Sequence, residues 1–236
     1  MTDKSTMDKS FIEENLMGPC SIEMLRQACR HLKIENGMKI LDLGCGKGLT
    51  SIWLAENFDV TVYAVDLWIS ANENYQRFLS LGLENRIIPL HANADELPFA
   101  DEYFDAVVSI DSYQYFGANE NYFPEVFSKL VKKGGQLGIA VPCVTKETNG
   151  IFPAFLKGLW PEDDFVNIKS LSWWEKCWGD TGIADLTSSG YIENARELWS
   201  EWAVVARRKY NFRDDELLTA DKDGLLSLMM MTAQKK

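Results

Sequence analysis

The sequence predicts an α/β protein in which helices cover both faces of a doubly wound, mainly parallel sheet. Short apolar runs alternate with stretches whose apolar residues recur every three or four positions, the spacing of a helix face. The apolar runs are continuous, as in strands that are buried on both faces. A glycine-rich turn follows the first run, where such a sheet forms its ligand crevice. The length of 236 residues suits one such domain.

The predicted elements follow one another in a regular order. The first helix, over 21–33, begins after the Gly18-Pro19 break, and residues 1–33 are expected to form an N-terminal helical cap. The expected strands cover 38–43, 60–66, 87–91, 104–110 and 136–141, and the helices between them cover 48–57, 70–81 and 119–131. This βαβ rhythm assigns residues 38–142 to the ligand-binding core.

The rhythm changes after Pro142. Residues 143–180 are rich in aromatic side chains, and we expect a lid insertion packed over the sheet rather than a further βαβ unit. Residues 181–236 are expected to complete the sheet, with a strand near 184–189 and a helix near 193–208. The final apolar run, 225–232, fits helix or strand by periodicity, and we favour a strand.

Composition narrows the class of partner. Lys and Arg number 24 against 35 Asp and Glu, a net charge of −11 that disfavours a nucleic-acid substrate. The basic run Arg207-Arg208-Lys209 is typical of the last turn of a helix. Five scattered cysteines and two histidines indicate reduced thiols and no metal site. Without a signal peptide or a membrane-length apolar run, the chain is expected to be cytoplasmic; a homodimer remains open.

The glycine-rich turn carries the chemical signal. It reads Asp42-x-Gly44-x-Gly46-x-Gly48, which differs from the G-x-G-x-x-G spacing of dinucleotide sites. The Asp42 carboxylate would repel a pyrophosphate but suits a positive amino group. Asp66 ends the second strand, where a carboxylate can accept both hydroxyls of a ribose. A ligand with a ribose and an ammonium group but no pyrophosphate is S-adenosylmethionine.

Residues 38–142 resemble the class I S-adenosylmethionine-dependent methyltransferases, in the small-molecule branch that includes quinone, sterol and phospholipid-base methyltransferases. The segments that carry the resemblance are 40–48, 65–67, 92–99, 104–109 and 132–135. The resemblance implies a seven-stranded sheet and S-adenosylmethionine as cofactor. Asn93 stands where the family often has Asp, and its amide oxygen can still accept from the adenine amino group. The expected cofactor-binding residues are Asp42, Gly44, Cys45, Gly46, Gly48, Asp66, Leu67, Asn93, Ala94 and Ser109.

The expected activity is methyl transfer from S-adenosylmethionine to an O, N or C atom of a small molecule. Asp111 and Tyr113 follow the fourth strand and are the candidates for a catalytic base, if the acceptor must lose a proton. The aromatic lid suits an apolar or aromatic acceptor. Two alternatives remain: a non-catalytic S-adenosylmethionine-binding module, and an NAD-dependent oxidoreductase, which the glycine spacing and Asp42 disfavour.

Overall fold

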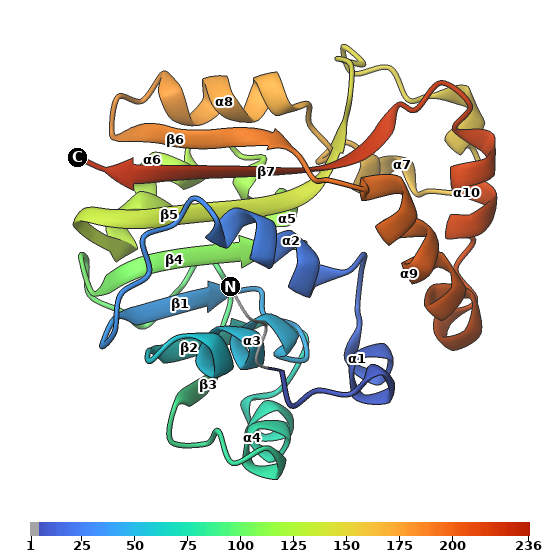
Figure 1. Cartoon of the computed structure of the whole chain (residues 1–236). Coiled ribbons are helices and arrows are strands. Elements are labelled where there is room, and N and C mark those ends of the chain that lie inside the picture. Colours follow the sequence, from blue (N-terminus) through green and yellow to red (C-terminus); the bar gives the residue numbers. More distant parts are fainter. Residues whose placement is uncertain (1–4) are drawn as a thin grey trace.

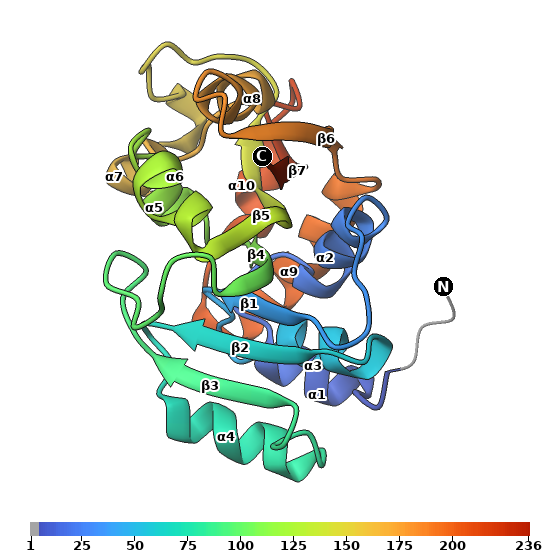
Figure 2. The same cartoon turned by 90° about the vertical axis from the view of Figure 1, so that its left-hand side faces the viewer.

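The computed structural model describes residues 5–236, so residues 1–4 of the predicted N-terminal cap lie outside the described residues. It contains a seven-stranded sheet in the order β3-β2-β1-β4-β5-β7-β6 (Figures 1 and 2). The strands are β1 Lys39–Leu43, β2 Thr61–Asp66, β3 Ile87–His91, β4 Phe104–Ile110, β5 Val131–Val144, β6 Ala184–Tyr191 and β7 Leu226–Lys235. Six strands of this sheet run in one direction, and β7 runs in the opposite direction between β5 and β6. The predicted fold class and the strand favoured for the C-terminus are confirmed.

The helices form layers on both faces of the sheet. They are α1 Lys9–Asn15, α2 Ser21–Cys29, α3 Leu49–Asn57, α4 Ala71–Ser80, α5 Gln114–Gly117, α6 Tyr122–Glu125, α7 Glu162–Phe165, α8 Leu171–Gly179, α9 Ala195–Tyr210 and α10 Asp214–Ala220, with 3-10 turns η1 Phe127–Leu130 and η2 Ala154–Leu156. Strand residues alternate between two buried clusters: Ala106 and Val108 pack on the α2–α3 side, and Val107 packs on the other. Each face therefore has its own core.

The single helix predicted over 119–131 is wrong. The chain forms α5, α6 and η1 instead, and Val126 leaves the helical backbone with φ −124°. The large rings of this segment are buried against α8, where Phe123 stacks on Trp178 with ring centroids 4.4 Å apart. Packing of these rings therefore overrides a continuous helix.

The interpretation of 143–180 as an insertion without a βαβ unit also needs correction. Helix α8 is the crossover between β5 and β6, which are parallel to each other because both run antiparallel to β7. Trp174 and Trp178 of this helix are fully buried in the sheet core. The segment that remains outside the sheet is 145–170, which we call the lid, and its Trp160 contacts Trp199 of α9 with centroids 5.9 Å apart. Figure 1 shows α7, α9 and α10 together beyond the carboxyl ends of β1 and β4.

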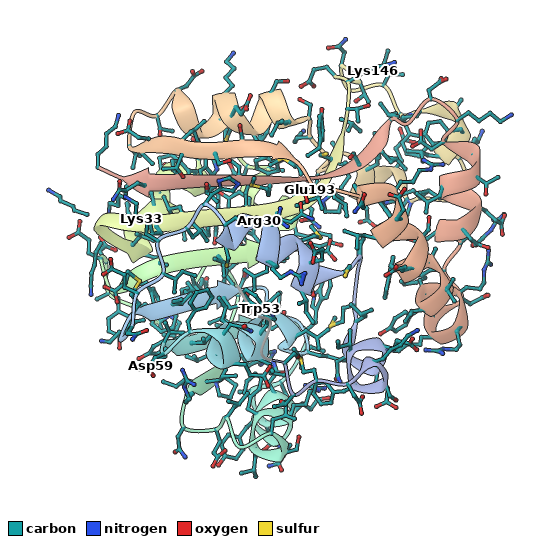
Figure 3. The ribbon with its side chains drawn as sticks, in the orientation of Figure 1. Arg30, Lys33, Trp53, Asp59, Lys146 and Glu193 are labelled. Carbon is teal, nitrogen blue, oxygen red and sulfur yellow. The ribbon has the colours of Figure 1, made fainter. Side chains whose placement is uncertain are left out.

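The N-terminal residues are tied to distant parts of the chain. Arg30, just after α2, forms an ion pair with Glu193 at 3.1 Å, and the two lie side by side in Figure 3. Residues 8–20, which we call the strap, contain α1 and reach the carboxyl edge of the sheet. Lys209 of α9 donates from Nζ to the Glu14 carbonyl at 2.6 Å, at the last turn of α1. A cation at this end is favourable for a helix, because its free carbonyls carry partial negative charge.

Candidate functional site

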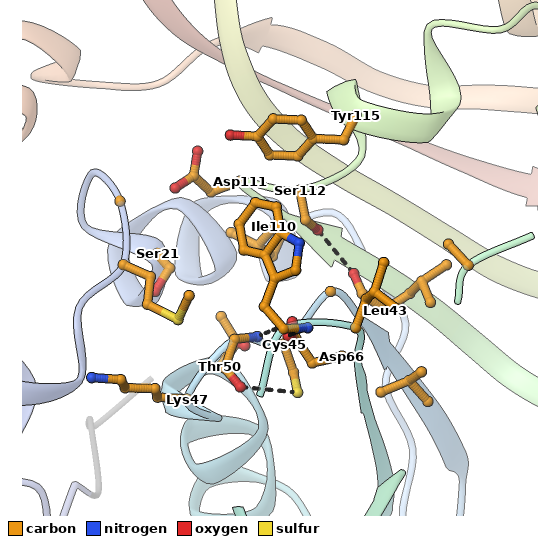
Figure 4. Close-up of a pocket in the computed structure, with 18 of the residues that line it drawn as sticks. Ser21, Leu43, Cys45, Lys47, Thr50, Asp66, Ile110, Asp111, Ser112 and Tyr115 are labelled. Carbon is orange, nitrogen blue, oxygen red and sulfur yellow. Dashed lines mark hydrogen bonds between the residues drawn. The ribbon is translucent and has the colours of Figure 1, made fainter. Parts of the chain in front are cut away.

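A pocket opens at the carboxyl ends of β1, β2 and β4, where the strand order reverses between β1 and β4 (Figure 4). It encloses about 960 Å³, its open mouth included. The residues that line it are Asn15, Met17, Gly18, Ser21, Leu43, Gly44, Cys45, Gly46, Lys47, Leu49, Thr50, Val65, Asp66, Leu67, Trp68, Ala92, Asn93, Ala94, Ile110, Asp111, Ser112, Tyr115 and Phe116. A crevice at this switch point is where open parallel sheets bind ligands.

The glycine turn after β1 forms the floor of the pocket. Gly44 and Gly46 have φ values of +75° and +53°, a left-handed backbone that glycine adopts without a Cβ clash. A Cβ on Gly44 would lie 2.3 Å from Oγ of Ser112, and one on Gly46 would lie 3.0 Å from Sδ of Met17. The Val65 carbonyl accepts from Gly44 N at 2.8 Å, which fixes the turn against β2. The loop is thus a rigid backbone cradle.

Gly48 lies outside the pocket. It precedes α3 in a left-handed conformation, φ +79°, and a Cβ there would lie 2.5 Å from the ring of Phe78. Phe78 on α4 is fully buried. We therefore assign Gly48 a packing role between α3 and α4 in place of the predicted contact with a cofactor.

Asp42 also lies beneath the pocket rather than in its lining. Its side chain is fully buried, and Oδ2 accepts from the hydroxyls of Thr50 and Ser51, each at 2.6 Å. Burial raises the pKa of this carboxyl to about 6, although the two hydroxyl groups oppose the shift. Among residues 5–236, Oδ1 has no hydrogen-bond partner. Asp42 holds the first turn of α3 under the glycine loop. Its side chain does not line the pocket and so does not contact a ligand there.

Asp66 connects the glycine loop to the next wall of the pocket. Its Oδ2 accepts from Gly46 N at 2.8 Å, and its Oδ1 accepts from Trp68 N at 2.8 Å and from Ile69 N at 2.9 Å. A carboxylate offers about four acceptor directions, so one remains for a ligand hydroxyl. The side chain lines the pocket while only 7% of the residue is exposed. This geometry supports one ribose contact, where the sequence predicted two.

The predicted adenine wall lies at the far side of Asp66. Leu67, Asn93 and Ala94 all line the pocket. The Ala94 carbonyl accepts from the Tyr122 hydroxyl at 2.9 Å, and Oδ1 of Asn93 accepts from Asp95 N at 3.1 Å. These bonds fix the loop after β3, so the wall is formed before any ligand binds.

Ser109, predicted to contact the cofactor, is buried in β4. Its hydroxyl donates to the Leu43 carbonyl at 2.8 Å, and its oxygen lies 2.8 Å from that of Ser112. Ser112 lines the pocket and donates to the same carbonyl at 2.9 Å, the bond drawn in Figure 4. Ser109 therefore joins β4 to the end of β1, and Ser112 is the serine that faces a ligand.

Asp111 is brought into the pocket as the sequence predicted. It follows β4 with φ +57°, a left-handed conformation that is costly for a side chain with a Cβ and is typical of functional positions. Its carboxylate lies against Gly18 of the strap, where a Cβ would come within 1.6 Å of Oδ2. Burial, reinforced by the negative charge of Asp214 on α10, raises the pKa of Asp111 to about 8. A carboxyl with this pKa can exchange a proton near neutral pH.

Tyr113 is a wrong prediction as a catalytic residue. It points into the core on the other face of the turn, with its ring 4.7 Å from Phe127 and 5.4 Å from Trp174. It is fully buried, and burial raises the pKa of its hydroxyl well above the ordinary value. The glycine at position 117, four residues on, is the sequence feature that accompanies this packing. A Cβ at Gly117 would lie 2.1 Å from the Tyr113 ring. Tyr115 is the tyrosine that lines the pocket, and Figure 4 shows it beside Asp111.

The strap and the first residue of α2 supply lining residues that sequence reasoning missed. Asn15, Met17, Gly18 and Ser21 come from the N-terminal segment, 23 or more residues before the glycine loop begins at Gly44. From the sequence, the Gly18-Pro19 pair indicated only a boundary before the next helix. No pattern in the sequence identifies which distant loop such a segment covers.

Two further properties bear on the site. Within the described residues, no group of three or more His, Cys, Asp or Glu side chains is placed to hold a metal ion. No helix in the same part of the chain has the length and apolar character of a membrane span.

Comparisons with known proteins agree with this geometry. Residues 40–135 match the model of a methyltransferase domain. Methyltransferase GfsG of Streptomyces halstedii is 31% identical over 138 residues, which are 57% of this chain and 49% of the relative. Dimethylglycine N-methyltransferase of Parasynechococcus marenigrum is 27% identical over 197 residues, 83% of this chain and 68% of the relative. The chain spans about half the length, or less, of the first curated relatives that it matches.

Solved structures share the fold. The geranyl diphosphate C-methyltransferase of Streptomyces coelicolor A3(2), in complex with Mg²⁺, geranyl diphosphate and S-adenosyl-L-homocysteine, matches with a TM-score of 0.71. The match covers 89% of this chain and 76% of that one at 17% identity. Residues 40–135 are therefore similar to a methyltransferase domain, and the chain shares its fold with this solved methyltransferase. The dimethylglycine N-methyltransferase among these relatives acts, by its name, on a small molecule.

Proposed function

We propose that this chain transfers a methyl group from S-adenosylmethionine to a small-molecule acceptor. The observation that carries the proposal is the pocket itself, which joins a left-handed glycine cradle, the acidic residue that ends β2 and a carboxyl after β4. A cofactor contributes an electrophilic methyl group on a positively charged sulfur when it is bound. The remaining chemistry is alignment of the acceptor, exclusion of water and removal of a proton.

The residues present fit such a cofactor. Gly44 and Gly46 line the pocket where a methionyl chain would lie, and a Cβ at either position would press on Ser112 or Met17. Asp66 retains one acceptor direction for a ribose hydroxyl. Asn93 and the apolar side chain of Leu67 would hold the adenine, and Lys47 and Ser21 on the strap side would face the methionyl carboxylate.

The acceptor end of the pocket would then lie at the residues after β4. Asp111 would accept the proton that the acceptor loses, since its carboxyl lines the pocket and its pKa of about 8 matches that task. Trp68 and Tyr115 contact each other edge to face, with centroids 5.6 Å apart, at the rim of this region. Their rings would exclude water from the reacting atoms.

The class of acceptor is proposed from the composition of the chain, and the cellular location from its cysteines. We propose a small molecule rather than a nucleic acid as acceptor, because the net charge of −11 opposes a phosphate backbone. A cytoplasmic location and a homodimer remain predictions, the first supported by free thiols at Cys20, Cys29, Cys45, Cys143 and Cys177.

Methyl transfer to a metabolite pool tests the proposal. The full chain is incubated with S-adenosylmethionine labelled in the methyl group and with a small-molecule cell extract. We expect label in a product below about 1 kDa and formation of S-adenosylhomocysteine. Cofactor binding without transfer to any acceptor would instead identify a non-catalytic binding module. Binding of NAD in place of S-adenosylmethionine would identify the oxidoreductase class.

A further inference from the structure

The carboxyl of Asp111 is an ionisable group in the pocket without a hydrogen-bonding partner. Within residues 5–236 its side chain makes no hydrogen bond and no ion pair. Its backbone is fixed by a bond from Asp111 N to the Ala140 carbonyl at 2.7 Å, and its carboxylate by contact with Gly18. The backbone of Asp111 is therefore held in place, while both oxygens of its side chain remain available to a ligand. A half-buried carboxylate in such a position requires a proton or a cation.

The surroundings of Asp111 are acidic. Asp214 on α10 acts on Asp111, and both Asp111 and Asp164 of α7 act on Tyr115, in each case raising the pKa of the group affected. Lys47 is the one cationic side chain among the lining residues of the described pocket. It belongs to the glycine loop and donates to the Glu14 carbonyl of the strap at 3.4 Å. The acceptor end therefore attracts cations and repels anions.

Aromatic rings complete this end of the pocket. Tyr115, Phe116 and Trp68 line it together with Asp111. A carboxylate beside exposed ring faces is an arrangement that holds an ammonium group, through an ion pair on one side and cation–π attraction on the other. An anionic or strongly polar neutral acceptor would gain nothing from these groups.

We propose that the acceptor is a primary or secondary amine, which enters as its ammonium ion and pairs with Asp111; this rests on the proposed methyl transfer. The ammonium gives its proton to the Asp111 carboxylate, which frees the nitrogen lone pair. A nitrogen–carbon bond then forms to the transferred methyl group while the carbon–sulfur bond breaks, with its electron pair left on sulfur. The product leaves as a methylated ammonium ion, and Asp111 returns its proton to solvent.

Fractionation of the acceptor pool tests this assignment without knowledge of the acceptor. A small-molecule cell extract is separated by ion exchange at pH 7 into cationic, neutral and anionic fractions. Each fraction is incubated with the full chain and methyl-labelled S-adenosylmethionine. We expect the label in the cationic fraction, in a product whose methyl carbon is bonded to nitrogen by NMR. Label confined to the neutral or anionic fraction overturns the amine assignment and leaves methyl transfer intact.

The variant Asp111→Asn keeps the size of the side chain and tolerates a left-handed backbone. Loss of one partner of a buried charge pair lowers amine methylation by at least about 30-fold. Binding of S-adenosylhomocysteine, measured by calorimetry, should change by less than about threefold, which shows that the variant is folded. Asp101→Asn, in an exposed turn before β4, is the matched control and should retain full activity. Equal activity of Asp111→Asn and the wild type overturns the role of Asp111, whereas absence of label in every fraction, with cofactor binding intact, overturns the methyl transfer and the inference with it.

Discussion

Arg77 of α4 donates from Nε to Oδ1 of Asn15 at 3.0 Å, and this bond joins the strap to the helix beneath the pocket. Arg77 also donates from Nη1 to Oδ1 of Asn74 at 2.6 Å. Asn74 is buried and donates in turn to the Gly46 carbonyl at 2.9 Å. One continuous network therefore connects the glycine loop to the segment that covers it, so opening of the strap and the shape of the loop are coupled.

We predict that Arg77→Met weakens binding of S-adenosylhomocysteine about three- to tenfold, because the strap loses its bond to α4 and the loop loses support. Amide hydrogen exchange of residues 9–20 should become faster in the same variant. Arg30→Met removes the same type of side chain from an ion pair with Glu193, remote from the pocket, and serves as the control. Unchanged affinity and exchange in Arg77→Met would show that the strap is held by other contacts.

Gly18→Ala tests the close contact between the strap and β4. The added Cβ would lie 1.6 Å from Oδ2 of Asp111, so the strap or the carboxylate must move. We expect methyl transfer to fall at least about tenfold while the melting temperature drops by only a few degrees, since the contact is at the surface of the pocket and not in the core. Gly179→Ala, which meets no atom within 4 Å, is the control. A fully active Gly18→Ala would contradict this placement of Asp111.

Gly48→Ala should behave in the opposite way. Its Cβ would lie 2.5 Å from the buried ring of Phe78, and its backbone has φ +79°. Both effects act on the fold, so we predict a loss of stability on the order of 2 kcal/mol in denaturant unfolding. Cofactor affinity measured well below the unfolding transition should change little. A variant of normal stability with lost affinity would return Gly48 to the cofactor site.

The stability of the chain should depend on pH through Asp111. Its pKa is about 8 in the folded chain against an ordinary value of 3.8, so the folded state holds a proton that the unfolded chain releases. The contribution of this carboxyl to stability is full below pH 3.8 and is lost as the pH rises toward 8. Asp111→Asn should therefore be more stable than the wild type at pH 8 by several kcal/mol, since each unit between the two pKa values contributes up to about 1.4 kcal/mol, with the difference vanishing near pH 4. Thermal unfolding at both values checks this; a constant difference would contradict the raised pKa.

The sequence identified the parts of the site that local chemistry determines. The left-handed turn at Gly44 and Gly46 was predictable because only glycine adopts it freely. Asp66 ends β2 and Asn93 follows β3, and the ends of these two strands meet at one edge of the sheet. Asp42 was placed at the right turn but with the wrong contact, because its Thr50 and Ser51 partners lie on the next helix. A spacing rule cannot tell which way a carboxylate turns.

Errors in the fold came from aromatic residues. Trp174 and Trp178 contribute to the sheet core through a crossover helix, although their surroundings in the sequence resemble an irregular lid. Tyr113 and Tyr115 are two residues apart and point to opposite sides of the turn after β4, one into the core and one into the pocket. Tertiary packing decides which aromatic side chains are buried, and no local pattern encodes that choice.

Calorimetric titration of the full chain with S-adenosylhomocysteine, with NAD as the competing ligand, tests the central claim most directly. The pocket of Gly44, Gly46, Asp66 and Asn93 predicts one site per chain with a dissociation constant in the micromolar range or below. It also predicts at least about tenfold weaker binding for Asp66→Ala, in which a ligand hydroxyl and three backbone N–H groups lose their acceptor. Binding of NAD but not of S-adenosylhomocysteine would contradict the account.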